Sequence, residues 1–303
     1  MFQNRFFKVL SLLGISSCLI LISLALFSSK TIYNFKYDPV PQNIRSPKLQ
    51  GDYDFAGEKL PLDNFDVAER LERELLANTY QHSGTIIHLK LAMRYFPEIE
   101  KILAEEGVPE DMKYLAVAES SLRNAVSSAG AKGMWQFRDA AAKELDLEVN
   151  EWVDERNHFE KSTRAACAYL KKLKAKFGSW TLAAAAYNMG PTGLQSAINE
   201  QKENNYFDLN LNEETNRYVF RIVGAKEILK QPERYGFYIQ ASEGYPKLNQ
   251  YTTVAVNTSI TNLADFAHEH NCTYRMLKVF NPWLTKSNLM NKSGKTYEIR
   301  IPK

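Results

Sequence analysis

A glutamate lies on the apolar face of a predicted helix in the stretch KYLAVAESSL, residues 113–122. The apolar positions, which recur at three- and four-residue steps, are Met112, Leu115, Ala116 and Leu122. Glu119 falls on the same stripe, where a carboxylate costs free energy unless it is paired or keeps its proton. Two interpretations follow. Glu119 is either satisfied by an arginine or backbone donors, or it is a general acid whose pKa is raised by burial and which protonates a leaving oxygen.

The segment RNAVSSAGAKGMWQF, residues 123–137, supplies polar and apolar groups soon after this glutamate. It is rich in Ser, Gly and Ala, which predicts a loop leading into a new helix. Gly133 permits close approach of backbone to a ligand. Met134 and Trp135 are apolar, whereas Gln136 both donates and accepts hydrogen bonds. This mixture suits a sugar, and the alternative is a helix start with a core tryptophan.

Two further segments place polar side chains at helix ends or faces. AAAAYNMG ends in Tyr187 and Asn188, which can reach into a cleft, and its four alanines let another helix pack closely. In EETNRYV, Tyr218 shares a helix face with Thr215 and Ile222. Taken singly, these residues are also compatible with an asparagine cap and with tyrosines in or at the edge of a core.

The elements that must position these residues are helices. No convincing strand is predicted between Asp66 and Lys230, so this part is expected to be all α. We expect Gly107, Gly178 and Gly190 to end helices and Pro97 to break or start one. After Tyr235 the residue pattern changes. It predicts a strand, two helices and a second strand in a small module.

The chain has 303 residues and predicts four regions. Residues 1–30 contain a basic start and an apolar run, 9–27, typical of a signal peptide or a membrane anchor. A lipoprotein signal acylated at Cys18 is a third interpretation, and all three place the remaining chain outside the cytoplasm. We expect a linker at 31–61, a helical domain at 62–240 and the small module at 248–303.

Composition excludes several classes of function. The net charge of +3 and the lack of a basic block give no indication of nucleic-acid binding. Three cysteines lie far apart and form neither a metal-spaced pair nor a disulfide framework. We expect no metal and no organic cofactor.

Together the four segments resemble the transglycosylase SLT domain of the family 1 lytic transglycosylases, glycoside hydrolase family 23. The matching motifs are Glu119-Ser120, SSAGAKGMWQ from Ser127, AYN from Ala186 and ETNRYV from Glu214. Their order and spacing agree over roughly residues 65–230. VPEDMKYLAVAESS and WVDERNHFEKSTRAACAYL are similar to the membrane-bound lytic murein transglycosylase D branch. The resemblance implies a lysozyme-like, mainly α catalytic domain.

The resemblance also implies roles for particular residues. Glu119 is the expected acid and then base, and Tyr187 and Tyr218 are expected to flank it. The residues implied to line the glycan groove are Ser120, Ser127, Met134, Gln136, Tyr187, Asn188 and Tyr218. The implied reaction cleaves the bond between N-acetylmuramic acid and N-acetylglucosamine in peptidoglycan and forms a 1,6-anhydro ring.

Residues 251–303 resemble a LysM domain, a βααβ unit that binds chains containing N-acetylglucosamine. The segment from Leu263 to Leu284 matches well, whereas VNTS, Val256 to Ser259, replaces the usual G-D-T turn. The module is therefore either a glycan binder or a structural cap.

Three functions stay open at this stage. The first is a lytic transglycosylase, the second a hydrolase of the same glycan like goose-type lysozymes, and the third a non-catalytic wall-binding protein. The expected partners are peptidoglycan strands and, through residues 9–27, a membrane. We expect a location in the cell envelope, the periplasm, and the sequence identifies no protein partner.

Overall fold

The computed structural model describes residues 45–303. The predicted signal or anchor at 1–30 and the first part of the predicted linker lie outside the described residues. Ser46 to Lys303 forms one compact unit. Among the described helices, none has the length and apolar character needed to cross a bilayer.

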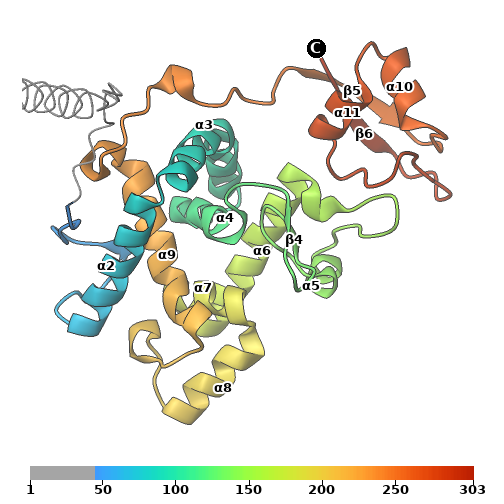
Figure 1. The fold of residues 1–303 in the computed structure, drawn as a ribbon. Helices are drawn as coiled ribbons and strands as arrows, with labels where there is room; N and C mark the ends of the chain where they lie inside the picture. Colours follow the sequence, from blue (N-terminus) through green and yellow to red (C-terminus); the bar gives the residue numbers. More distant parts are fainter. Residues whose placement is uncertain (1–44) are drawn as a thin grey trace, which may run out of the picture. The chain divides into compact units, whose positions relative to one another are not determined.

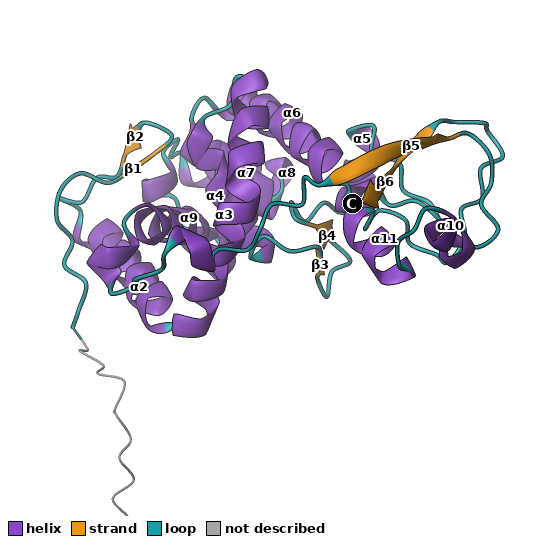
Figure 2. Ribbon diagram, turned by 90° about the horizontal axis from the view of Figure 1, so that it is seen from above, coloured by secondary structure: helices purple, strands orange, loops and turns teal. Residues whose placement is uncertain are grey.

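Helices dominate the unit (Figures 1 and 2). They are α2 (Phe65–Tyr80), α3 (His82–Glu105), α4 (Lys113–Ser120), α5 (Asp139–Glu144), α6 (Phe159–Phe177), α7 (Trp180–Met189), α8 (Pro191–Gln201), α9 (Glu213–Lys230), α10 (Leu263–Glu269) and α11 (Tyr274–Phe280). The strands form three antiparallel pairs: β1 (Asp54–Phe55) with β2 (Glu58–Lys59), β3 (Ala125–Val126) with β4 (Lys132–Gly133), and β5 (Tyr251–Val256) with β6 (Tyr297–Pro302). The prediction of a mainly α fold is confirmed.

The helix α9 is the centre of the larger core, because it packs against α2, α4 and α7. The predicted apolar stripe of α4 and its flanks is confirmed: Met112, Leu115, Ala116 and Leu122 are fully buried. In α7, the four consecutive alanines, 183–186, are also fully buried and allow the close packing that their size predicts.

Glycines end helices where the sequence predicts. Gly178 follows α6 in the left-handed conformation at φ 82°, and Gly190 follows α7 at φ 88°. Gly107, at φ 66°, follows α3, and its N–H donates to the carbonyl of Ala104.

The prediction for Pro97 is wrong, because this proline lies inside the continuous helix α3. A proline removes one intrahelical hydrogen bond and disfavours a helix interior, but tertiary packing can outweigh that cost. Both Phe96 before it and Ile99 after it are buried in the core, which keeps the helix in place on each side of the proline.

Two further predictions need correction. The predicted linker, 31–61, ends earlier, since Tyr53 and Phe55 are buried in the main core around the β1–β2 hairpin. Burial of these two rings gives this short segment enough apolar contact to join the helical part. Strands also occur between Asp66 and Lys230: β3 and β4 are two residues each, too short to produce an alternating pattern in the sequence.

The C-terminal module has the predicted order of strand, two helices and strand. Its strands pair in a continuous register from Tyr251 opposite Pro302 to Val256 opposite Tyr297. A second cluster of buried side chains holds it together: Val256, Leu263, Ala267, Leu277, Trp283, Leu284, Leu289, Tyr297, Ile299 and Ile301, together with Val153. Because Val153 precedes the module by about a hundred residues in sequence, the two parts share packed surface.

Candidate active site

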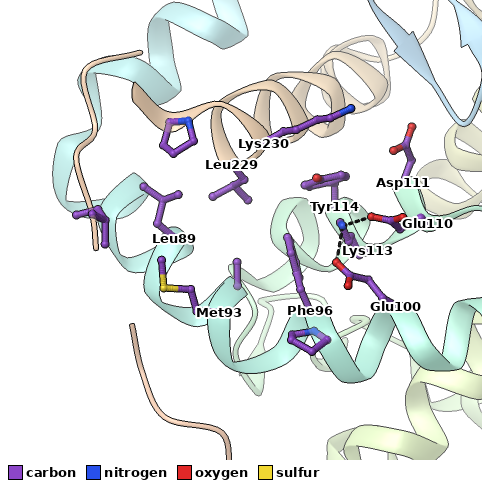
Figure 3. A pocket seen from close by; sticks show the side chains of 14 residues that line it. Leu89, Met93, Phe96, Glu100, Glu110, Asp111, Lys113, Tyr114, Leu229 and Lys230 are labelled. Carbon is purple, nitrogen blue, oxygen red and sulfur yellow. Dashed lines mark hydrogen bonds and ion pairs between the residues drawn. The ribbon is translucent and has the colours of Figure 1, made fainter. Parts of the chain in front are cut away.

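The helix α4 is fixed at both ends. At its start, Lys113 Nζ lies 2.6 Å from Glu100 Oε1 and 2.5 Å from Glu110 Oε1, beside a cavity of about 480 Å³ (Figure 3). At its end, the hydroxyl of Ser120 donates to the carbonyls of Ala116 and Met134, at 3.1 and 2.8 Å. These contacts hold the first and the last residue of α4 in place.

The carboxyl of Glu119 faces α9. The hydroxyl of Tyr218 donates to Glu119 Oε1 at 2.5 Å, although 99 residues separate the two in sequence. Arg221, one turn further along α9, donates instead from Nη2 to the carbonyl of Ala118 at 2.8 Å. Glu119 is therefore held by a neutral phenol, and the nearby guanidinium is engaged by the main chain.

Burial raises the pKa of Glu119 from 4.5 to about 7. The hydrogen bond from Tyr218 and the charge of Arg221 lower this pKa, and the charge of Glu214 raises it. Glu119 keeps some solvent contact, but its surroundings are dense enough for desolvation to dominate. A carboxyl with this pKa holds a proton near neutral pH and can also release one, as an acid–base catalyst requires.

Tyr187 and Asn188 lie at the end of α7, and Tyr187 is near the Glu119 carboxyl. Burial is the main cause that raises the pKa of Tyr187, and the charge of Glu119 raises it further. The Tyr187 hydroxyl donates to the carbonyl of Trp135 at 2.7 Å. Asn188 Nδ2 donates to Glu214 Oε1 at 3.1 Å, and Asn188 Oδ1 accepts a bond from Thr215 at 2.7 Å. Asn188 therefore links α7 to the start of α9.

The segment after α4 carries three of the other predicted groove residues. Ser127 Oγ accepts from the N–H of Ala131 at 3.0 Å, which closes the β3–β4 turn. Gln136, at φ 52°, donates from Nε2 to the carbonyls of Ala125 and Gly133. Met134 is buried, with 4% of its surface exposed. The side chains of Ser127 and Gln136 thus stabilise the loop that adjoins the acid.

Trp135 supports the alternative of a core tryptophan. It is fully buried, and its Nε1 donates to Thr163 Oγ1 on α6 at 3.0 Å. The main chain of Trp135 rather than its ring reaches the site, through the bond from Tyr187.

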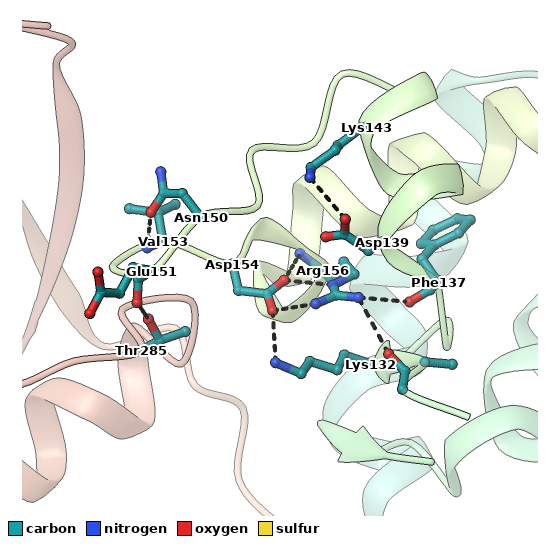
Figure 4. Close-up of polar contacts among 12 residues, drawn as sticks. Lys132, Phe137, Asp139, Lys143, Asn150, Glu151, Val153, Asp154, Arg156 and Thr285 are labelled. Carbon is teal, nitrogen blue, oxygen red and sulfur yellow. Dashed lines mark hydrogen bonds and ion pairs between the residues drawn. The ribbon is translucent and has the colours of Figure 1, made fainter. Parts of the chain in front are cut away.

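A buried ion pair between Arg156 and Asp154 stabilises the segment that contains the GMWQF motif (Figure 4). Arg156 Nε and Nη2 donate to the two carboxylate oxygens of Asp154 at 2.8 and 2.7 Å, and Nη1 donates to the carbonyl of Phe137 at 3.3 Å. Lys132 Nζ is 3.3 Å from Asp154 Oδ2. Arg156 therefore ties the end of the GMWQF motif to the segment that follows α5.

The backbone of Gly133 packs against other protein backbone and leaves no room for a ligand there. Its φ is 85°, and a Cβ at this position would lie 1.9 Å from the carbonyl oxygen of Arg156. The interpretation that this glycine admits a ligand is therefore wrong.

Gly133→Ala is expected to destabilise the protein by at least about 2 kcal/mol, because both the left-handed backbone and the backbone contact oppose a Cβ. Urea unfolding measures this change. Gly130→Ala is the matched control, since Gly130 has φ 78° but nothing lies within 4 Å of its added Cβ. A Gly133 variant no less stable than the Gly130 variant would contradict the role of the contact.

Two residues near Glu119 were not predicted as part of the site. Arg221 and Glu214 flank Tyr218 at three and four residues on α9, so helical periodicity could have identified them. Asp139, a carboxylate three residues after Gln136, forms an exposed pair with Lys143 at 2.8 Å. Within residues 45–303, no group of His, Cys, Asp and Glu side chains is arranged to hold a metal ion.

The stability of the Glu119→Gln variant is expected to exceed that of the wild type at high pH. The folded-state pKa of about 7 lies above the ordinary 4.5, so the stabilising contribution of neutral Glu119 is complete below 4.5 and is lost as pH rises through 7. Glutamine cannot ionise and avoids this loss. Urea unfolding at about pH 4 and about pH 9 should show the difference growing by on the order of 3 kcal/mol. A constant difference would contradict the raised pKa.

Two known families match separate parts of the chain. The family described as the transglycosylase SLT domain matches residues 97–210, and the soluble lytic transglycosylase C-terminal LysM-like domain matches residues 252–303. The chain thus contains an SLT domain followed by a LysM-like domain. Glu119 and the GMWQ and AYN motifs lie inside the first match, and Tyr218 lies just beyond it.

Curated relatives match parts of the chain. The chain is 27% identical over 258 residues to membrane-bound lytic murein transglycosylase D of Escherichia coli (strain K12), covering 82% of this chain and 55% of that protein. It is 33% identical over 107 residues to a putative tributyltin chloride resistance protein of Alteromonas sp. (strain M-1), covering 35% of this chain and 50% of that protein. The chain thus spans about half the length of these relatives.

Among solved structures, an inactive mutant of lytic transglycosylase Slt from Pseudomonas aeruginosa matches with a TM-score of 0.38 and 19% identity. The match covers 49% of this chain and 26% of that one.

Proposed function

We propose that this protein is a lytic transglycosylase that cleaves the β-1,4 bond between N-acetylmuramic acid and N-acetylglucosamine in peptidoglycan. One observation carries the proposal: within the SLT match, Glu119 has a pKa raised to about 7 and accepts a hydrogen bond from Tyr218. The relative's name, a murein transglycosylase, supports the same substrate class.

Glu119 acts twice in the proposed reaction. Its proton passes to the oxygen that bridges the two sugars, and the bond from C1 of the muramic acid to that oxygen breaks. The substrate's N-acetyl group stabilises the cationic centre. The Glu119 carboxylate then takes the proton of the C6 hydroxyl, whose oxygen bonds to C1 and closes the 1,6-anhydro ring. The intramolecular nucleophile is favoured over water by proximity, and no water is consumed.

Of Glu119, Asp139 and Glu214, Glu119 is the carboxyl for which the geometry supports a catalytic role. Conventional glycosidases place two carboxylates across the scissile bond. Here Asp139 is paired with Lys143 on the exposed helix α5, and Glu214 is bound by Asn188. This arrangement favours a nucleophile supplied by the substrate itself.

Digestion of purified murein with the purified full chain, followed by mass analysis of the products, tests the proposal. We expect muropeptides that end in 1,6-anhydromuramic acid, each lighter by one water than the reducing product. Reducing ends alone would establish a hydrolase, and no released product would overturn both enzymatic functions.

The pH dependence of cleavage is expected to follow Glu119. Protonated Glu119 begins the reaction, so kcat/KM should fall as pH rises through about 7. Tyr218→Phe removes a hydrogen bond that lowers this pKa, so the alkaline limb of the profile should move to higher pH. A profile measured with soluble murein fragments checks this. An unchanged limb in the Phe variant would show that Tyr218 does not set the pKa of Glu119.

We also propose a location in the cell envelope, with residues 9–27 as the anchor if they are not cleaved. The relative's description as membrane-bound supports this placement. The boundaries at 62–240 and 248–303 remain predictions.

A further inference from the structure

The C-terminal module contacts the helical part through main-chain bonds near the buried ion pair. The N–H of Asp154 donates to the carbonyl of Trp283, and the N–H of Thr285 donates to the carbonyl of Trp152, at 2.8 and 2.9 Å. Val153 between them is buried in the module's own core. This docking sets one face of the module opposite α3 and the start of α6.

A cavity of about 410 Å³ lies between those faces, within the size range of ligand sites. One wall holds the ring pair Tyr95 and Phe159, with centroids 5.4 Å apart. The opposite wall holds the pair Tyr251 and Phe280, with centroids 6.2 Å apart. All four rings are partly exposed, so each wall presents aromatic surface to a ligand.

Polar and charged groups complete the lining, and the charged ones are Arg94, Glu98, Lys101, Glu160, Lys247 and Arg300. Amides of Asn124, Asn157 and Asn249 supply donors and acceptors. Arg300 lies 4.6 Å from the Tyr251 ring centroid, and its Nη2 is 2.6 Å from Glu160, so its charge is already balanced. Aromatic walls with amides suit a pyranose, whose apolar faces stack on rings and whose hydroxyl and N-acetyl groups need hydrogen bonds.

One residue links the lining of this cavity to the end of α4. Met134 lines it, and the carbonyl of Met134 accepts the hydrogen bond from Ser120, the residue that follows Glu119. The residue after the proposed acid therefore contacts a residue of the cavity wall. The VNTS turn at 256–259, where the sequence departs from the LysM pattern, does not line this cavity.

We propose that the helical part and the C-terminal module together form a saccharide-binding site, in which Tyr95 and Tyr251 on opposite walls stack on sugar rings of the glycan strand. That the bound strand is peptidoglycan rests on the proposed function. That the cavity binds a saccharide does not. The proposed site makes the C-terminal module part of the substrate groove rather than a separate anchor or a structural cap.

Binding measured in the full chain carrying Glu119→Gln tests this site without cleavage. The probes are chitotetraose and peptide-free glycan strands, titrated by calorimetry and by the fluorescence of Trp283 and the other tryptophans. Tyr95→Ala and Tyr251→Ala should each raise Kd by about five- to tenfold, the size expected for loss of one aromatic contact. Tyr274→Ala is the matched control, because Tyr274 is exposed on α11 and does not line the cavity; its Kd should change by less than about twofold.

Several results would overturn the proposal. Failure of the parent chain to bind either probe, or unchanged Kd in both cavity variants, removes the site. Peptide-bearing muropeptides are titrated as a third probe, and a Kd increase restricted to them assigns the cavity to the stem peptide instead. Equal melting temperatures for the Tyr251 and Tyr274 variants exclude loss of folding as the cause of weaker binding, and Tyr95→Ala probes the opposite wall independently.

The outcome is separable from that of the proposed function. Weaker binding in the cavity variants supports the saccharide site even if the wild-type chain releases no product from murein. Anhydro products with unchanged binding in both variants would keep the transglycosylase function and reject this site.

Discussion

Replacing Glu119 with glutamine is expected to lower the rate of murein cleavage at least about 100-fold, the lower end of what general acid–base catalysis contributes. Glutamine keeps the shape and can still accept the Tyr218 hydrogen bond, but it has no proton to give to the bridging oxygen. Release of soluble muropeptides from purified murein by the full-length variant measures the effect.

Asp139→Asn serves as the matched carboxyl-to-amide control. Asp139 lies on exposed α5 and pairs with Lys143, so its loss should leave cleavage within about twofold of wild type. A Glu119→Gln variant that retains more than about one per cent of wild-type turnover would count against this carboxyl as the acid.

Replacing Arg156 with methionine is expected to destabilise the fold by about 3–5 kcal/mol, because it leaves Asp154 buried without its main partner. Both side chains are almost fully buried, at 4% and 2% exposure, and Arg156 also binds the carbonyl of Phe137. Burial alone would raise the pKa of Asp154, but Arg156 and Lys132 reverse this and hold it below its ordinary value. Urea unfolding of the full chain at neutral pH measures the loss.

Lys143→Met provides the comparison, since the pair of Lys143 with Asp139 is more than half exposed on both sides and should contribute less than about 1 kcal/mol. Because Arg156 holds the segment that carries Met134 and Gln136, we also expect lower cleavage activity in Arg156→Met under conditions where it is folded. Equal stability of the two variants would show that the buried pair does not stabilise this segment.

Local patterns predicted the elements well because they depend on neighbours in sequence. The apolar stripe around Leu115 indicated the buried face of α4, and the left-handed glycines after α6 and α7 marked their ends. Pro97 was misplaced for the complementary reason: its cost is local, whereas the packing of Phe96 and Ile99 that offsets it comes from other helices.

The residue types at the site were also readable, but their contacts were not. Gly133 indicated a close approach, yet only the tertiary structure shows that its neighbour is the carbonyl of Arg156. Trp135 likewise offered either a sugar platform or a core ring, and the bond to Thr163 on α6 decides for the core.

By itself the sequence determined that a glutamate lies on an apolar helical face and that three other motifs follow it in a family order. The tertiary structure alone decided that Tyr218, 99 residues later, is the group that binds this carboxyl, while Arg221 bonds to the main chain. The physical reason is that a pKa depends on the groups and the solvent around the carboxyl in space, and those are brought together only when α4 packs against α9.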